Sequence, residues 1–503
     1  MKYDAIVVGT GAGGGTIGFS LAKKGLKVLF IEKGANYLNG LKGDYTESFK
    51  ANDNQKWEYL LKNSGRDFDK VVENRRTKIP FLGSGTGGST ALYGMAMERF
   101  SKDDFNPHQI DTLKQKSNLP SDGWPISYKE LLPFYLEAER LYQVRGTEDP
   151  LKNGDSFNYL KPPKLNDSNK ELYEFFKDKG LNPYILPRAC NFVDGCIECQ
   201  GFLCPLNCKN DSFNTCVKPS IEKYGAKLID NAEVTKVHYK NDKIIGIEYL
   251  KNDKIEFISS QIYILALGAI RTPVLMLSSD NLSNSSGLVG KNLMRHCIDL
   301  FLVKTKIKPP SDGFLKEIAL NDLYSTKNNR LGTFQSFGRI PPSKIILENI
   351  FNSTITPLII PIEKLMDYFL SFFLPMNSII EDLPYLTNYI TLHSDRKTPK
   401  INFQLNEYEK HQISLSRKTI KKLLGAKKSI LIRQAEDNKR LAHVCGTCRM
   451  GTDKKTSVVN ENCRSHEIKN LYIADASIFP TSGGTNPALT IIANSLRIAK
   501  NIT

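Results

Sequence analysis

The stretch Asp4-Ala-Ile-Val-Val8, followed by Gly9-Thr-Gly11-Ala-Gly-Gly14, decides the fold class of this chain. The apolar run predicts a strand buried in a parallel sheet. A helical pattern continues through Ala22, and residues 27–31 form a second apolar run. This strand–helix–strand order is typical of α/β folds with a doubly wound sheet.

The glycines Gly9, Gly11 and Gly14 have the spacing G-x-G-x-x-G between that strand and that helix. The first glycine permits the turn, the second lets the backbone approach a pyrophosphate, and the third packs the helix on the strand. Glu32 follows the second strand, where a carboxylate accepts from a ribose hydroxyl. The pattern predicts a dinucleotide site, and by itself it does not distinguish NAD from FAD.

The far end of the chain contains a second strand–turn–helix segment. Residues 471–474 predict a buried strand that ends at Asp475, and residues 489–498 predict a helix. We expect Asn486 as the N-cap of that helix and Pro487 at its first position. The positive end of such a helix would stabilise the negative charge of a reduced flavin.

Composition excludes several classes of protein. The 503 residues are 40% hydrophobic and 24% charged, which is typical of a globular protein, and no uncharged apolar run reaches the length of a spanning helix. The net charge of +16 comes from scattered lysines, which favours a solvated basic surface over a nucleic-acid site. No secretory signal follows Met1, so we expect a cytoplasmic protein with reduced thiols.

The apolar residues 350–383 have three interpretations: a lid over the site that favours a greasy alcohol, a segment of the core, or a patch for peripheral membrane contact.

Several further segments carry a resemblance to one family. Together they resemble the glucose–methanol–choline (GMC) family of FAD-dependent oxidoreductases, although Asp280-Asn281 departs from the usual ending of the family's second signature. The matching segments are Gly85–Ser89 through Arg99, Trp124-Pro125-Ile126 with Tyr135, Gly268–Met276, Gly290–His296, His443–Gly451 and Asp475–Thr490.

The resemblance implies a Rossmann-type FAD-binding domain of α/β class, interleaved with an α+β domain of sheet and helices that binds the substrate. The FAD domain would comprise residues 1–100, 185–300 and 436–503, and the substrate-binding and lid domain residues 101–184 and 301–435. The expected FAD contacts are Gly9, Gly11, Gly14, Glu32, Gly85, Gly88, Ser89, Val234, Asp475, Ala476, Asn486 and Pro487.

The resemblance also implies the chemistry. His443 would take the hydroxyl proton of a small alcohol while hydride leaves its carbon for flavin N5, because a developing alkoxide is a good hydride donor. Asn486 occupies the family's second catalytic position, where an amide can donate to the substrate oxygen. The electrons would pass to oxygen or to an acceptor protein. We expect the other histidines, including His296 and His466, to be structural.

A cysteine-rich segment leaves three interpretations open. The spacing of Cys199, Cys204 and Cys208 resembles that in bacterial FAD glucose dehydrogenases, where such cysteines hold an iron–sulfur cluster. Thiolates at this spacing suit zinc equally well, and unliganded thiols are the third interpretation.

Two other functions remain as alternatives. One is a flavoprotein acting on nucleic acid, which only the charge and the glycine loop suggest; the other is a non-redox lyase on the same scaffold. No hydrolase or phosphoryl-transfer motif of the types G-x-S-x-G, G-x-x-x-x-G-K or H-E-x-x-H is found in the chain.

Overall fold

The fold is described from a computed structural model of the chain. The described residues are 3–36, 66–67, 69–106, 123–152, 154–310, 315–326, 329–338, 340, 360–437 and 441–502.

A five-stranded parallel sheet forms the first layer, as the strand–helix–strand pattern predicts. Its order is β20-β12-β1-β2-β8, so strands from the beginning, the middle and the end of the chain lie side by side. The central strands are buried on both faces, which is why they are continuous apolar runs in sequence. The strands are β1 (Tyr3–Val8), β2 (Val28–Ile31), β8 (Lys227–Ile229), β12 (Ser260–Leu265) and β20 (Leu471–Ile473).

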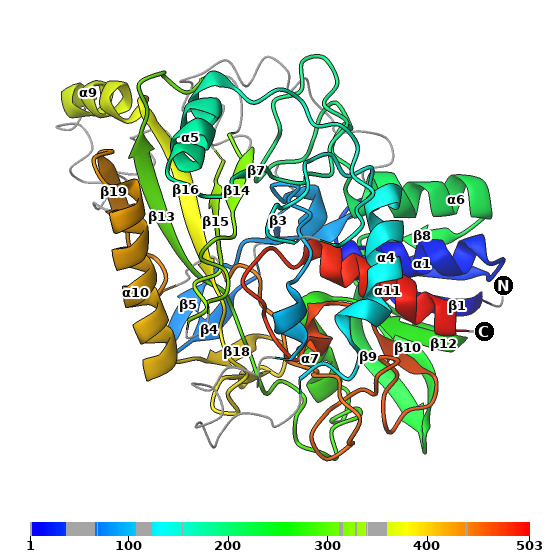
Figure 1. Cartoon of the computed structure of the whole chain (residues 1–503). Coiled ribbons are helices and arrows are strands. Elements are labelled where there is room, and N and C mark those ends of the chain that lie inside the picture. The colour runs from blue at the N-terminus through cyan, green and yellow to red at the C-terminus, as the bar shows by residue number, and fades with distance from the viewer. Residues whose placement is uncertain are drawn as a thin grey trace.

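Helices from the two ends of the chain pack together beside this sheet. Figure 1 shows α1 (Ala12–Lys23) in blue next to α11 (Ala488–Asn501) in red, with α4 (Tyr128–Leu141) alongside α11. Lys24 Nζ donates to the Ala499 carbonyl at 2.7 Å, which ties the end of α1 to the end of α11. The start and the finish of the chain therefore meet, as an FAD site built from both ends requires.

A second, six-stranded antiparallel sheet lies apart from the first (Figure 1). Its order is β19-β13-β16-β15-β14-β7, and its outer face packs against helices α5 (Asp167–Asp178) and α10 (Glu407–Leu424) through a core that includes Phe176, Phe334 and Ile420. Its strands are β7 (Tyr184–Ile185), β13 (Cys297–Lys304), β14 (Ile318–Leu320), β15 (Thr333–Ser336), β16 (Phe373–Ile380) and β19 (Ser429–Ile432).

Smaller elements complete the fold. The three alternating segments predicted near residues 234–258 form the antiparallel sheet β9 (Glu233–Lys240), β10 (Lys243–Lys251) and β11 (Lys254–Ile258). The remaining strands form two small sheets: β3 (Arg66–Asp67) with β6 (Leu82–Gly83), and β4 (Val71–Glu73) with β5 (Arg76–Lys78), β17 (Tyr389–Leu392) and β18 (Pro399–Asn402). The remaining helices are α6 (Lys218–Tyr224), α7 (Gly268–Ser278) and α9 (Ile360–Leu370). Four short helices are η2 (Gly88–Ala91), η3 (Lys102–Phe105), η5 (Phe213–Val217) and η7 (Ala476–Ile478).

The apolar residues 350–383 do not form one unit. Strand β16 is buried throughout as a central strand of the six-stranded sheet, so the interpretation as core is confirmed for that part and the lid is wrong there. Helix α9 exposes Leu365, Tyr368 and Phe369. Residues 350–359 lie outside the described residues. Within the described part of the chain, no helix is long and apolar enough to span a membrane. The residue boundaries of the two domains stay a prediction.

Candidate active site

The start of α1 offers a cradle for a phosphate group. Among the described residues no side chain caps this helix, so its first backbone N–H groups are available as donors. A Cβ atom on Gly11 would meet no described atom within 4 Å, whereas one on Gly14 would lie 2.1 Å from the Gly9 carbonyl oxygen. Gly14 therefore serves packing, and Gly11 faces open space. These features fit the pyrophosphate of a dinucleotide.

The second glycine loop lies directly over this helix end. A Cβ atom on Gly88 would lie 2.9 Å from Gly11 Cα, and Gly85 and Gly88 both adopt positive φ, which favours glycine. Ser89 Oγ accepts from the Gly83 backbone rather than pointing at Gly11. The structure thus brings together the loops predicted to enclose the pyrophosphate.

Glu32 connects the two loops. Its Oε2 accepts from the backbone and the hydroxyl of Thr10, and its Oε1 accepts from the backbone of Gly34 and Gly85. Burial raises the pKa of Glu32, and these hydrogen bonds oppose that shift. Ribose recognition by Glu32 stays a prediction, and it requires one of these donors to give way. Val234 is buried on β9. Just before this strand, the backbone N–H of Ala232 donates to the carbonyl oxygen of Glu32, so β9 begins beside Glu32.

The C-terminal segment differs from the expectation in two details. Asp475 accepts from the backbone of Gly268 and Ser477 and from the Thr272 hydroxyl, so it caps the start of α7 in this structure. Helix α11 begins at Ala488 with Pro487 at the cap, so the prediction of Asn486 as the N-cap is wrong by one residue. The side chain of Asn486 does not cap the helix and instead accepts a hydrogen bond from Gln335 Nε2. No described side chain caps α11, and its positive end stays available to a negatively charged group.

His443 lies against a second histidine, His296, so the prediction that His296 is only structural is wrong. The Nδ1 atoms of His443 and His296 are 2.8 Å apart. The pairing follows from a backbone bridge, because Met294 and Cys445 exchange two hydrogen bonds between the chain segments that carry the two histidines. The further backbone bonds from Gly446 and Cys448 to residues 476–477 hold the same segment against η7.

The hydrogen bonds of His296 determine which nitrogen of His443 carries the proton. His296 Nε2 lies 3.0 Å from the carbonyl oxygens of Ser482 and Gly483, which only accept, so Nε2 carries the proton. His296 Nδ1 then accepts from His443 Nδ1–H. His443 Nε2 is left unprotonated, and it makes no hydrogen bond to any described residue. A neutral His443 can therefore accept a proton only at Nε2.

Burial and nearby charge keep this pair neutral. Desolvation lowers the pKa of His296 to about 4, and desolvation, His296 and Lys316 lower the pKa of His443 well below its usual value. Desolvation also lowers the pKa of the buried Lys316 to about 8. His443 adopts φ +59°, a sparsely populated conformation that persists where the surroundings enforce it, as often occurs at active sites.

Asn486 faces the inner side of the six-stranded sheet. Its Oδ1 accepts from Gln335 Nε2 at 3.1 Å, which leaves the Asn486 amide group as a donor without a partner among the described residues. The loop before it is fixed to the sheet, since Thr333 N donates to the Gly484 carbonyl at 2.9 Å. The carbonyls of Ser482 and Gly483 in this loop hold His296. One loop therefore links the two predicted catalytic residues.

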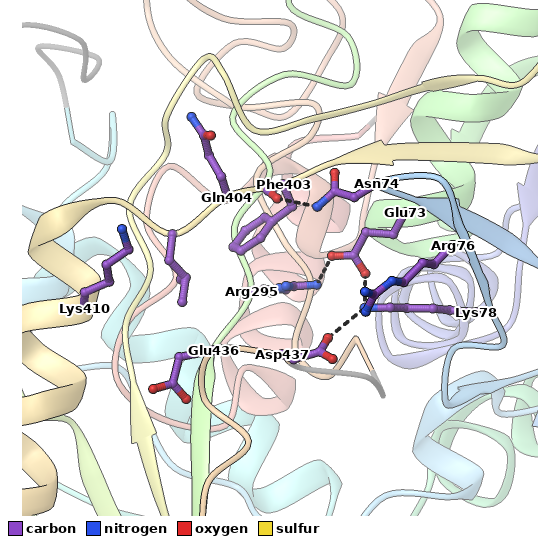
Figure 2. Close-up of a pocket in the computed structure, with 11 residues that line it drawn as sticks. Glu73, Asn74, Arg76, Lys78, Arg295, Phe403, Gln404, Lys410, Glu436 and Asp437 are labelled. Atoms are coloured by element: carbon purple, nitrogen blue, oxygen red, sulfur yellow. Dashed lines mark hydrogen bonds and ion pairs between the residues drawn. The ribbon is translucent and has the colours of Figure 1, made fainter.

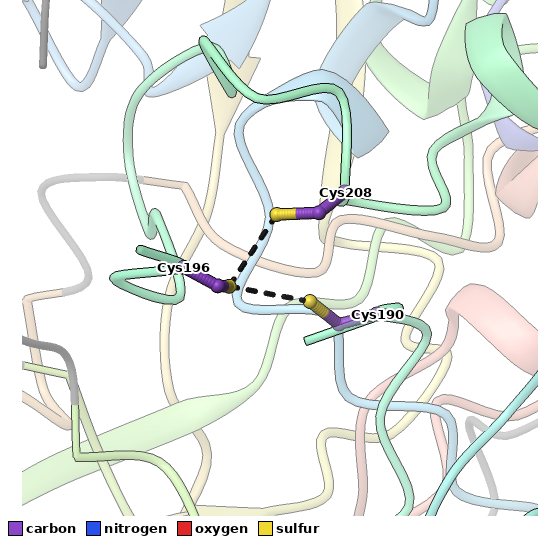
Figure 3. Close-up of side chains that lie close together, drawn as sticks. All are labelled: Cys190, Cys196 and Cys208. Carbon is purple, nitrogen blue, oxygen red and sulfur yellow. Dashed lines mark hydrogen bonds between the residues drawn. The ribbon is translucent and has the colours of Figure 1, made fainter. Parts of the chain in front are cut away.

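The cysteine-rich segment brings together a different set of thiols from the predicted one. Cys196 Sγ lies 3.7 Å from Cys190 Sγ and 3.3 Å from Cys208 Sγ, and Figure 3 shows these three side chains pointing toward one another. Cys204 Sγ lies 3.4 Å from Cys208 Sγ, but Cys204 and Cys199 are both outside the group whose sulfurs could share one ion. The spacing rule missed Cys190 and Cys196 because loop geometry, not separation along the chain, decides which thiols meet.

A separate pocket of about 700 Å³ contains none of the predicted site residues. Figure 2 shows part of its charged lining in ion pairs: Arg295 donates to Glu73 at 2.6 Å, and Lys78 contacts both Glu73 and Asp437. The pocket is linked to the histidine pair only by sequence: Arg295, which lines the pocket, directly precedes His296.

Sequence reasoning missed His296, Gln335 and Lys316. The first stands in the segment Gly290–His296, which resembles the family, and that signal could have singled it out. Gln335 and Lys316 lie in residues 300–435, where no resemblance was found.

Comparison with known proteins identifies similar chains. Models of GMC oxidoreductases match residues 3–298 and 384–495. A 2-methyl-1,2-propanediol dehydrogenase of Mycolicibacterium austroafricanum is 27% identical over 539 residues, covering 100% of this chain and 95% of the relative. Among solved structures, pyridoxine 4-oxidase from Mesorbium loti has a TM-score of 0.68 at 16% identity and 99% coverage of both chains. A formate oxidase of Aspergillus oryzae RIB40, studied for modification of its FAD, has a TM-score of 0.67 at 14% identity, covering 99% of this chain and 97% of that one.

Proposed function

The chain belongs to the GMC oxidoreductase family, and we propose that His443 is the general base when this FAD-dependent enzyme oxidises the CH–OH group of a small alcohol to a carbonyl. The related dehydrogenase takes its name from an alcohol, 2-methyl-1,2-propanediol. The observation that supports the proposal best is the His296–His443 pair, because it leaves His443 Nε2 unprotonated and without a partner among the described residues.

The residues at both ends of the chain fit FAD. The uncapped start of α1 and the glycine loop around Gly88 would hold the pyrophosphate, Glu32 and Val234 would lie toward the adenosine, and the start of α11 would face the flavin. When bound, FAD supplies the acceptor for the hydride that leaves the carbinol carbon. These individual contacts are proposals that follow from the family and from the glycine geometry.

The chain's own side chains perform the proton chemistry. His443 Nε2 accepts the hydroxyl proton, and its Nδ1–H stays bonded to His296. The Asn486 amide donates to the substrate oxygen as negative charge develops there, and its bond from Gln335 keeps that donor directed away from the sheet. A positioned base of this kind contributes about 10²- to 10⁴-fold to the rate.

After the reaction the electrons would pass from the flavin to oxygen or to an acceptor protein.

The relatives support FAD and give no support for the iron–sulfur cluster predicted at Cys199, Cys204 and Cys208. Two thiolates on one tetrahedral zinc ion, each about 2.3 Å from it, lie about 3.8 Å apart. The distances of 3.7 Å and 3.3 Å from Cys196 Sγ to the sulfurs of Cys190 and Cys208 fit a single ion better than a cluster whose thiolates bind different irons. The cytoplasmic location and a peripheral membrane contact stay predictions.

Kinetics of a single variant tests the role of His443. We expect His443→Ala to lower kcat with an alcohol substrate by about 10²- to 10⁴-fold while the purified variant retains its flavin. Unchanged turnover would remove His443 from the proposal. Neither a nucleic-acid substrate nor a non-redox lyase reaction is favoured by the family or by the relatives named above.

A further inference from the structure

Two amide side chains stand next to each other on the inner face of the six-stranded sheet. Gln335 on β15 is directly opposite Asn377 on β16. Their chain neighbours Phe334 and Met376 pack into the core beneath α5 and α10, so by strand alternation Gln335 and Asn377 point to the other face. That face carries the Gln335–Asn486 hydrogen bond. The two amides therefore belong to the surroundings of the proposed catalytic residues.

Both amides have a buried carbonyl oxygen without a partner. Gln335 is 0% and Asn377 3% exposed, and neither Gln335 Oε1 nor Asn377 Oδ1 has a hydrogen-bond partner among the described residues. Buried polar atoms in folded proteins are nearly always paired, because an unpaired one loses its hydration without compensation. The unpaired atoms here are acceptors, so the group that satisfies them is a donor.

A substrate hydroxyl group is the donor that this site would receive. Directly opposite residues of paired strands have Cβ atoms about 5 Å apart, which is the scale of the spacing between hydroxyl groups on one short carbon chain. The backbone groups of β15 and β16 are already paired with each other, so they do not supply the missing donors. A simple aliphatic alcohol has only the hydroxyl that faces His443 and Asn486, and it would leave both amide oxygens unpaired.

We propose that the substrate is a polyol, and that Gln335 and Asn377 select it by accepting hydrogen bonds from hydroxyl groups other than the one oxidised. This inference rests on the proposed function, since it concerns the same site. In the reaction one carbinol loses a hydride to the flavin and a proton to His443. The additional hydroxyl groups are unchanged; they bind and orient the substrate.

A series of three-carbon alcohols tests the inference. The full-length flavin-containing protein is given propan-1-ol, propane-1,2-diol and glycerol, and kcat/KM is measured for each. A site built to bind a hydroxyl group discriminates strongly against an analogue that lacks it. We expect kcat/KM to be at least about tenfold higher for glycerol, whose two further hydroxyl groups can donate to both amides, than for propan-1-ol, with propane-1,2-diol between them.

Two variants assign the selectivity to the amides. Asn377→Leu should reduce the glycerol-to-propanol ratio of kcat/KM by about tenfold while the propanol value changes little. Gln335→Leu should reduce the same ratio by about tenfold and also lower the propanol value, because it releases Asn486. Gln412→Leu is the matched control, since Gln412 on α10 is also a buried amide with an unpaired carbonyl oxygen but lies on the helical side of the fold. The control should keep the wild-type ratio. Flavin content and the melting temperature identify any variant that fails to fold. The comparison of the three alcohols on the wild-type protein does not depend on any variant.

Equal kcat/KM values across the three wild-type substrates would overturn the inference while leaving alcohol oxidation intact. An equal loss with glycerol and propan-1-ol in both leucine variants would overturn the assignment to Gln335 and Asn377. Absence of flavin reduction with every alcohol would overturn the proposed function itself, and the inference with it.

Discussion

His296 Nδ1 lies 2.8 Å from His443 Nδ1, and the other nitrogen of His296 is held by the carbonyls of Ser482 and Gly483. Because those carbonyls can only accept, the proton positions along the chain of hydrogen bonds are determined up to His443 Nε2. An aspartate fixes the tautomer of the catalytic histidine in serine proteases by the same principle. Here the fixing group is neutral, and desolvation keeps its pKa at about 4.

The first prediction concerns His296 as a positioning residue. His296→Leu removes the acceptor for His443 Nδ1–H, so the unprotonated nitrogen is no longer fixed at Nε2, and kcat should fall at least about tenfold. His296→Asn supplies an amide oxygen as an acceptor and should recover part of the loss. His466→Leu is the control, because His466 bonds to Ser457 instead. Equal activity of His296→Leu and wild type would refute the positioning role.

The second prediction concerns the pH dependence of kcat/KM. The lowered pKa of His443 means that the neutral base is fully present at pH 7 and is lost only as the pH falls through that lowered pKa. The rate should therefore stay level through about pH 6.5, where an ordinary histidine is half protonated. A fall in rate centred near pH 6.5 in the wild type would contradict this.

The third prediction separates the contribution of Lys316. Its positive charge is the third cause of the lowered pKa of His443, after desolvation and His296. Lys316→Met removes that charge, so the pKa of His443 should rise and the acid limb of the kcat/KM profile should move to higher pH. Lys427→Met, in which a lysine bonded to Glu171 is replaced, should leave the limb in place. An unmoved limb in Lys316→Met would show that Lys316 does not act on His443.

The parts of the fold that could be predicted are those determined by short segments of sequence. The apolar run 4–8 and the glycines after it require only local packing rules, and the sheet and α1 follow them. The His296–His443 pair could not be predicted in this way, because 147 residues separate the two rings and the bridge between Met294 and Cys445 brings them together. Strand β16 was ambiguous for a related reason: it is buried on both faces, so its sequence lacks the alternation that marks a strand.

The fourth prediction distinguishes two glycines of the same motif. A Cβ atom on Gly11 meets no described atom within 4 Å, so Gly11→Ala should fold and lose flavin, because the methyl group occupies the space for the pyrophosphate. A Cβ atom on Gly13 would lie 1.6 Å from the Ala474 carbonyl oxygen, so Gly13→Ala should reduce the free energy of unfolding by about 3 kcal/mol or more. Flavin content and melting temperature measured on both variants check the contrast. Full flavin content in Gly11→Ala would place the pyrophosphate elsewhere.

The fifth prediction concerns the thiols. Elemental analysis of protein purified without chelators should find one zinc ion per chain, because three sulfurs within reach of one ion supply three of the four ligands of a tetrahedral site, and water can supply the fourth. Cys208→Ser should lose the metal, and Cys216→Ser, which changes a buried cysteine near Tyr142 outside the group, should retain it. Iron with acid-labile sulfide would instead restore the iron–sulfur prediction, and absence of any metal would leave these cysteines as unliganded thiols.

Anaerobic mixing of the purified protein with propane-1,2-diol tests the central claim most directly. The measurement is the absorbance of the bound oxidised flavin over time, in the wild type and in His443→Ala. We expect the wild type to lose this absorbance in a single turnover and the variant, with the same flavin content, to lose it at least about 10²-fold more slowly. A protein that binds no flavin, or a flavin that is reduced equally fast in both, would contradict the account.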